Sequence, residues 1–332
     1  MITSPNTLKR FRKSNSRLLL GRFHPSLVMN TAFMTTTKVG LQTIVTRGPA
    51  NTGFWIDWGD GSALEWVQHL GVGINVTTTH TYVDSGAKYQ KWIGNLNPIT
   101  YINIASQSYS FDVEQEIINK FANLIFLYIS TSPTLFGNLN GVKKFVDLNI
   151  LYIGDSGSSY TADISNWVTL VNMQSFSGRG TIGLTGDLST LSTWVLSNQI
   201  DFSICANITG NLASLSTWTN AQYINLNNCP GLTIPINSLS TWTSLVALNA
   251  YGTPATYSTT VLPAWNGAAI RFDSCGLSTA EVDQLFIDHN TAVMTGGTLN
   301  YAGTNDPISG GAPVLAAIAA LTGRGVTCVY NT

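Results

Sequence analysis

Charged residues are scarce in this chain. They make up 10% of its 332 residues, whereas about 25% is usual in globular proteins. Hydrophobic residues account for 44% of the sequence, which is enough apolar material to build extensive cores. The surface must therefore consist largely of Ser, Thr, Asn and Gly. A neutral polar coat of this kind favours a particle-borne or extracellular protein over a crowded cytosolic enzyme.

Long apolar runs are also missing. No stretch approaches the roughly 20 apolar residues that a membrane-spanning helix needs. The run of three leucines at residues 18–20 is too short for the apolar segment of a signal peptide, and no small-residue cleavage site follows it. The sequence therefore predicts neither a membrane span nor Sec-dependent export.

The residues that carry most catalytic and metal chemistry are few. Four histidines are scattered through the chain, at His24, His69, His80 and His289. No zinc signature, phosphate-binding glycine loop or nucleophile elbow appears. We therefore predict a non-enzymatic protein that needs no metal and no cofactor.

The few charges are unevenly distributed. The first 22 residues contain no acidic residue and six basic ones, which are Lys9, Arg10, Arg12, Lys13, Arg17 and Arg22. The remaining chain carries 10 basic and 17 acidic residues. We interpret residues 1–30 as a basic arm that docks on a partner surface and becomes ordered there. Nucleic acid is not the expected partner, because no recognisable nucleic-acid-binding fold accompanies the arm.

A short sequence motif recurs between residues 163 and 276. Its best copies read Leu-Ser-Thr-Trp, and its tryptophans are spaced by 27, 24, 24 and 23 residues, at Trp167, Trp194, Trp218, Trp242 and Trp265. A fixed period of this size predicts a solenoid, in which each unit buries its apolar face against its neighbours. At these positions the tryptophans are expected to be packed inside rather than exposed.

After each tryptophan comes a short alternating segment that predicts a brief strand, at residues 171–173, 200–202, 224–226, 247–249 and 270–272. Three residues beyond the inner apolar position we expect a buried slot, filled by Phe176, Cys205, Cys229, Tyr251 and Cys275. The cysteines, including Cys328, are interpreted as free structural thiols. Further strands are expected at residues 124–129 and 145–150, with a helix over residues 113–123.

The best copies match the pattern L-x-L-x-x-N/C-x-L, for example at Ile224, Leu226, Cys229 and Leu232. Together with the Leu-Thr-Gly steps at 184–186, this resembles leucine-rich-repeat proteins, and the resemblance covers residues 98–332. A capping box at Ser278 is expected to open a helix to about residue 294. A strand at 297–301, a second helix from residue 313 and a strand at 326–330 would complete an α/β cap over about residues 277–332.

Residues 31–97 differ from the repeats, because β-branched and aromatic runs alternate there with turn residues and predict a small all-β domain. Two sequence motifs, Asp57-Trp-Gly-Asp60-Gly-Ser and His80-Thr-Tyr82, resemble motifs of the PKD-type immunoglobulin-like domain. Asp60 and its flanking glycines are expected to build a turn rather than a calcium or catalytic site. The whole chain is thus expected to be mainly β with short helices: a PKD-like β-sandwich, then a leucine-rich-repeat solenoid.

A candidate binding face follows from the repeat strands. Residues between the apolar positions should point away from the core and form a polar ladder on the concave sheet: Asn172, Gln174, Asp201, Ser203, Asn225, Asn227, Asn249, Arg271 and Asp273. Such amides and hydroxyls suit hydrogen bonding to sugars or polar protein loops. The alternative is that they are solvated strand positions whose amides bond one another.

The closing segment, with Gly-Gly-Thr-Leu at 296–299 and Gly-Arg-Gly-Val-Thr at 323–327, resembles C-terminal segments of bacteriophage virion and tail proteins. The pairing of PKD-like and leucine-rich parts resembles surface proteins of Bacteroidetes bacteria. We therefore expect a virion structural protein, open to homo-oligomerisation, that docks on other virion proteins through its arm and binds a host-surface glycan or protein. The alternatives are a bacterial cell-surface adhesin that binds glycans, and an intracellular scaffold.

Overall fold

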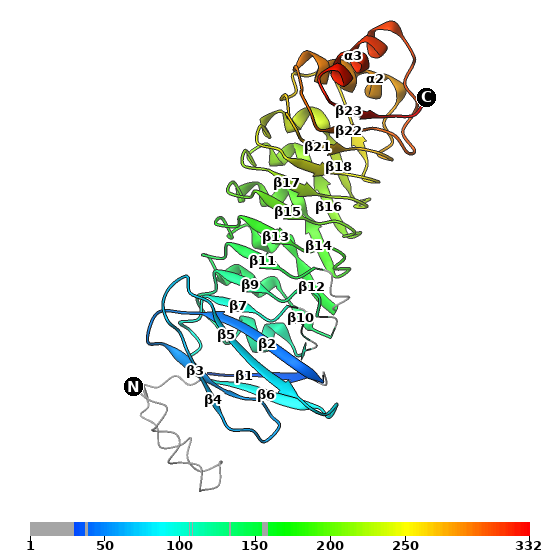
Figure 1. Cartoon of the computed structure of the whole chain (residues 1–332). Helices are drawn as coiled ribbons and strands as arrows, with labels where there is room; N and C mark the ends of the chain where they lie inside the picture. The colour runs from blue at the N-terminus through cyan, green and yellow to red at the C-terminus, as the bar shows by residue number, and fades with distance from the viewer. Residues whose placement is uncertain (1–29, 37–38, 106, 108, 133, 155–158) are drawn as a thin grey trace. The chain divides into compact units, whose positions relative to one another are not determined.

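The computed structural model describes residues 30–332, apart from residues 37–38, 106, 108, 133 and 155–158 (Figure 1). Contacts divide the chain into two compact units, Met1–Gly137 (unit 1) and Asn138–Thr332 (unit 2). The six cations of the expected basic arm lie outside the described residues. The expected boundary between residues 97 and 98 falls inside unit 1.

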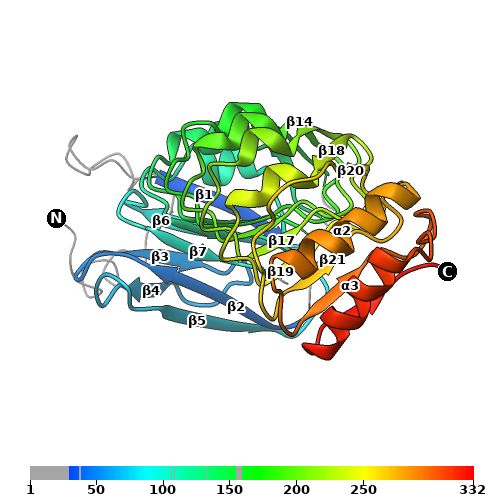
Figure 2. The same cartoon turned by 90° about the horizontal axis from the view of Figure 1, so that it is seen from above.

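Unit 1 is built around a β-sandwich. Its strands are β1 (Asn30–Thr36), β2 (Gly40–Arg47), β3 (Gly53–Asp57), β4 (Glu65–Gln68), β5 (Val76–Tyr82), β6 (Lys88–Gly94), β7 (Tyr101–Asn103), β8 (Tyr109–Ser110) and β9 (Phe126–Tyr128). One sheet has the order β4-β3-β6-β1-β8, and the other runs β9-β7-β2-β5 within this unit (Figure 2). A single turn of π-helix, η2 (Glu114–Ile118), stands where a longer helix was expected.

The Asp57–Ser62 stretch forms the expected turn. Asp60 Oδ1 accepts the backbone N–H of Ser62 at 3.0 Å, and Gly59 and Gly61 have φ angles of 76° and 84°, which suit glycine. The imidazole of His80 lies 2.7 Å from Asp60 Oδ2. The turn-building interpretation of this motif is confirmed, whereas the resemblance to PKD domains stays a prediction.

Unit 2 contains a main sheet of consecutive parallel strands (Figure 1). They are β11 (Ile150–Tyr152), β13 (Ser175–Ser177), β15 (Gln199–Asp201), β17 (Tyr223–Asn225), β19 (Ala247–Asn249), β21 (Ala269–Arg271), β22 (Thr298–Asn300) and β23 (Thr327–Val329). Their apolar middle residues stack in register, so that Ile224 pairs with Leu248 and Leu248 with Ile270. The stacked middle residues from Leu151 to Leu299 are buried.

A second parallel sheet and short 3-10 helices complete each coil. The sheet contains β12 (Ser159–Asp163), β14 (Leu184–Asp187), β16 (Ile208–Asn211), β18 (Leu232–Pro235) and β20 (Ala255–Thr256), while β10 (Phe136–Asn138) lies at the unit boundary. The helices are η3 (Asn140–Lys144), η4 (Ile164–Trp167), η5 (Leu188–Thr193), η6 (Leu212–Leu215) and η7 (Ile236–Thr241). The second sheet was not expected from the sequence.

The recurring tryptophans are buried, as predicted, and tie each coil to the one before it. The indole N–H of Trp218 donates to the carbonyl of Leu191 at 3.0 Å, and that of Trp242 donates to Leu215 at 3.1 Å. Phe145 is the residue directly after η3, as Trp242 is the residue directly after η7. The predicted strand at 145–150 is therefore wrong, because this stretch leads into β11.

The C-terminal cap contains the two helices and two strands that the sequence predicts. The helix α2 (Thr279–Thr291) opens with a capping box in which Ser278 and Glu281 bond each other reciprocally. The helix α3 (Ala312–Gly323) begins with a proline in its first turn, and β22 and β23 extend the main sheet. These predictions are confirmed.

Candidate functional site: the outward face of the main sheet

The candidate site is the face of the main sheet that points away from the core of unit 2. From β15 to β22 the middle residue of each strand is buried, and the first and third residues face outward. We call this surface the sheet face. It comprises Gln199, Asp201, Tyr223, Asn225, Asn227, Asn249, Tyr251, Arg271, Asp273 and Asn300.

Two of the predicted site residues lie elsewhere. Asn172 and Gln174 precede β13, which begins at Ser175, because three extra residues follow Trp167 in this coil. The predicted strand at 171–173 is therefore wrong. Asn172 instead donates its side-chain N–H to the carbonyl of Val146 at 3.1 Å. Ser203 is fully buried, so its predicted outward position is wrong. The other six predicted residues, from Asp201 to Asp273, lie on the sheet face, although Asp273 is only 8% exposed.

In several strands the side chain of the third residue accepts a hydrogen bond from the turn that follows the strand. Asp201 Oδ1 accepts the backbone N–H of Ser203 at 2.8 Å, and Asn249 Oδ1 accepts that of Tyr251 at 3.3 Å. Asn300 does the same for Ala302 at 3.2 Å. These are Asx-type bonds, which explain why Asn and Asp recur at this position. They occupy one side-chain oxygen and direct the remaining polar atoms outward.

An amide and a carboxylate of the sheet face also bond each other across strands, whereas the alternative interpretation expected bonds between amides. The side-chain N–H of Asn225 donates to Asp201 Oδ2 at 3.3 Å across neighbouring strands. Asp201 Oδ1 in turn accepts from the hydroxyl of Ser203 at 2.5 Å. This part of the sheet face is therefore internally satisfied and held in one arrangement.

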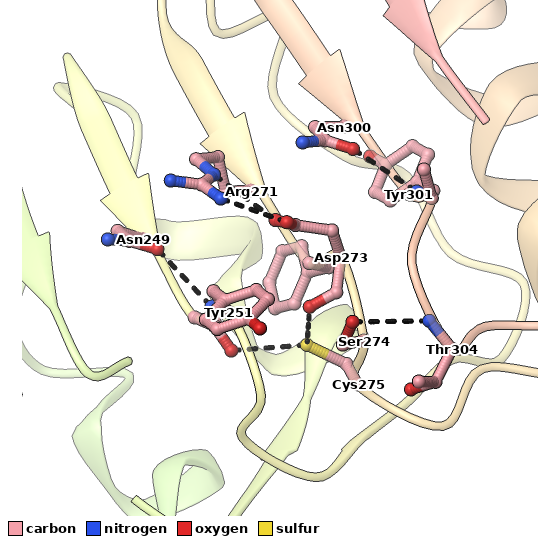
Figure 3. A network of polar contacts seen from close by, with 12 residues as sticks. Asn249, Tyr251, Arg271, Asp273, Ser274, Cys275, Asn300, Tyr301 and Thr304 are labelled. Carbon is pink, nitrogen blue, oxygen red and sulfur yellow. Dashed lines mark hydrogen bonds and ion pairs between the residues drawn. The ribbon is translucent and has the colours of Figure 1, made fainter. Parts of the chain in front are cut away.

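A fixed cation lies on β21 (Figure 3). Arg271 donates from Nε and Nη2 to the two carboxylate oxygens of Asp273, at 3.1 and 2.9 Å, and its Cζ lies 5.6 Å from the centre of the Tyr251 ring. The hydrogen bonding of Arg271 to the carboxylate of Asp273 is the main cause of the raised pKa of Arg271. Bidentate pairing restricts the guanidinium while leaving its remaining N–H groups available.

Sequence reasoning missed two tyrosines of the sheet face. Tyr223 is 49% exposed as the first residue of β17, and Tyr251 is 38% exposed beside Arg271. Tyr251 was assigned to the buried slot, and this assignment is wrong because Thr253 occupies the slot. The slot residue follows the second apolar residue of each coil by three positions. In this coil the second apolar residue is Ala250, which is small and easily overlooked, so the slot falls on Thr253.

The slot forms a ladder of side-chain donors beneath the sheet. The thiol of Cys229 donates to the carbonyl of Phe202 at 3.0 Å, and the hydroxyl of Thr253 donates to that of Leu226 at 2.5 Å. Phe176, also assigned to the slot, is the middle residue of β13 instead. The four cysteines are free, and burial raises the pKa of Cys205 and of Cys275 to about 12. The structural-thiol interpretation is confirmed.

No group of three or more His, Cys, Asp or Glu side chains in the described part is placed to hold a metal ion. Among the helices described, none is long and apolar enough to cross a bilayer.

Parallel strands stacked one coil apart, a buried donor slot and short helices define unit 2 as a parallel β-solenoid. No family model matches the sequence, and no curated protein matches it. Similar solved structures include the Arabidopsis receptor kinase HAESA in complex with the peptide hormone IDA and the co-receptor SERK1, with 14% identity and a TM-score of 0.40 over 63% of this chain and 39% of that one.

A second similar structure is the leucine-rich-repeat ectodomain of the Arabidopsis thaliana receptor kinase GASSHO1/SCHENGEN3 in complex with CASPARIAN STRIP INTEGRITY FACTOR 2. It shares 13% identity and a TM-score of 0.35, over 70% of this chain and 38% of that one. The present chain thus spans less than half the length of either protein. The description of unit 2 as a solenoid rests on its own coils.

Proposed function

We propose that this protein is a non-enzymatic recognition protein that binds another protein through the sheet face. The observation that carries the proposal is the exposed Tyr251 beside the fixed guanidinium of Arg271, with a second exposed tyrosine, Tyr223, on the same face. Tyrosine and arginine dominate the energetics of protein interfaces, because they combine large contact area with directed hydrogen bonds. The surrounding asparagines supply polar contacts of the kind that tyrosine-rich paratopes use.

We further propose that the protein works on a bacteriophage particle. The support comes from the sequence: the basic residues 9–22 suit docking on other virion proteins, and the closing segment resembles phage virion proteins. In this setting the sheet face would meet a host-surface protein or another virion subunit. A chain lacking residues 1–25 is then expected to be absent from purified particles, as measured by immunoblotting, while a chain with Tyr223→Ala is still incorporated.

A bacterial cell-surface adhesin that binds a glycan is the second candidate. It is favoured by the outward side chains of Asn225, Asn249 and Asn300, whose amides suit sugar hydroxyls. Loss of binding after enzymatic deglycosylation of the target, with the protein component intact, would support this candidate over the first.

The test of the sheet face uses the full chain as bait against two probes, purified particles and a host envelope extract. We expect Tyr223→Ala combined with Tyr251→Ala to lower capture of the bound protein at least tenfold, because both aromatic contacts are removed. The matched control is Tyr89→Ala, which removes a tyrosine that is 63% exposed on β6. Equal capture by all three chains, at equal melting temperatures, would exclude the sheet face as the binding surface.

A further inference from the structure

The strand β5 is a bare edge of the β-sandwich in unit 1. It is the last strand of its sheet and pairs with β2 alone among the described strands. It runs for seven residues, Val-Thr-Thr-Thr-His-Thr-Tyr, without a lysine or a proline. Edge strands of monomeric proteins are commonly short, charged, bulged or interrupted by proline, because an open edge invites another strand. β5 has none of these safeguards.

The pairing of β2 shows which backbone groups of β5 face the open edge. The carbonyl of Arg47 accepts the N–H of Thr100 at 2.9 Å, so the odd-numbered residues of β2 direct their backbone groups toward β7. The even-numbered residues therefore bond β5, where Ile44 lies opposite Thr78. Three residues of β5 consequently direct their N–H and C=O groups away from the sheet: Thr77, Thr79 and Thr81.

We propose that β5 pairs antiparallel with β5 of a second copy of this chain, about a two-fold axis through Thr79. In this register Thr79 lies opposite Thr79 of the second copy, and Thr77 lies opposite Thr81. Each of these pairs exchanges two backbone hydrogen bonds through the groups that point outward. The two sheets become one continuous sheet, and the dimer is closed by symmetry.

The side chains of β5 are complementary to themselves in this register. Thr77, Thr79 and Thr81 are exposed on one face of the strand, so every cross-strand pair on that face is Thr with Thr, a pairing that stabilises sheets. A shift by two residues would replace one of these pairs with Asn75 or Val83. The strand contains no Lys, Arg, Asp or Glu, so no like charges meet, and His80 is already bound to Asp60.

The first experiment measures the mass of the full chain by sedimentation velocity over a range of concentrations. We expect a shift from 35.7 kDa toward twice that mass as the concentration rises. Thr79→Pro should remain monomeric, because it removes an N–H that faces the edge while sparing every bond to β2. Thr79→Val keeps the backbone donor and should still dimerise. A wild-type chain that stays monomeric throughout, or a dimeric Thr79→Pro chain, would overturn the proposal.

Two further variants keep the test independent of any loss of folding. Across the two-fold axis the Cα atoms of residue 79 should lie about 5.5 Å apart, which is within the range of a disulfide. Thr79→Cys should therefore form a covalent dimer on oxidation, while Thr209→Cys, an exposed position in unit 2, should not. Lysines at both Thr77 and Thr81 should abolish dimers, and mixing that chain with one carrying glutamates there should restore them. Failure of both the cross-link and the charge rescue contradicts the interface.

Discussion

His289 on α2 is a fully buried imidazole whose surroundings favour its neutral form. Its Nε2 lies 2.7 Å from the hydroxyl of Tyr301, and the rings of Trp265 and Tyr301 flank it at 5.5 and 6.2 Å. Burial lowers the pKa of His289 to about 4. The nearby carboxylate of Asp288 favours the charged form, but it offsets only part of the cost of burial.

We predict that unit 2 loses stability as the pH falls from 7 to 5. The unfolded chain takes up a proton on His289 near pH 6.5, whereas the folded chain resists protonation until about pH 4. The unfolded state therefore binds more protons in this window, and the free energy of unfolding falls by about 1.4 kcal/mol per pH unit for one such group. Urea unfolding at a series of pH values measures the slope.

The control for this prediction is His289→Gln, which cannot titrate. Its unfolding free energy should be lower at pH 7 but should depend less on pH between 7 and 5. His69, whose pKa burial also lowers to about 4 in unit 1, is the same in both chains. Identical pH slopes for the two chains would show that His289 does not couple folding to protonation.

At the scale of the element, the repeats show what a sequence pattern can and cannot reveal. The tryptophan spacing and the three slot cysteines predicted the coils, because large or distinctive residues recur there. The slot residue Thr253 was missed since Ala250 stands at the second apolar position, where the pattern calls for a large side chain. The strand of the Trp167 coil was predicted at the wrong residues for a related reason, because Gly178 stands at its second apolar position.

The donor slot leads to a second prediction. Thr253→Val keeps the shape of the side chain but removes two bonds: the one to the carbonyl of Leu226 and the one that its oxygen accepts from the N–H of Cys229 at 3.0 Å. Each buried backbone group left unpaired costs about 1–3 kcal/mol. Thr253→Ser keeps the hydroxyl and should cost about 1 kcal/mol, for a lost methyl group. Equal unfolding free energies for the two variants in urea would argue against the ladder as a stabilising element.

At the scale of the whole molecule, long-range strand pairing is what the sequence could not reveal. β1 pairs with β8 and β2 pairs with β7, so both sheets of the sandwich take strands from beyond residue 97. The backbone N–H of Phe33 also donates to Glu116 at 2.6 Å. Local patterns predicted a small all-β domain over residues 31–97, but a change in composition does not show where a sheet ends.

These pairings predict how fragments of the chain behave. A fragment of residues 30–137 should unfold cooperatively on heating, because it keeps β7 and β8, the partners of β2 and β1. A fragment of residues 30–97 lacks β7, β8 and η2, and should show weak or no cooperativity in circular dichroism. Comparable melting of the two fragments would place the folding boundary at residue 97 after all.

The ladders described above run inside unit 2, while the first residue of each strand faces outward and differs from coil to coil, as Gln199, Tyr223, Ala247 and Ala269 show. The parts that must stay constant are therefore separate from the parts that are free to vary. Duplication or loss of one 24-residue coil in the gene would preserve every internal bond type and yet change the length and chemistry of the outward surface. Such a design allows the outward surface to change while the fold is preserved.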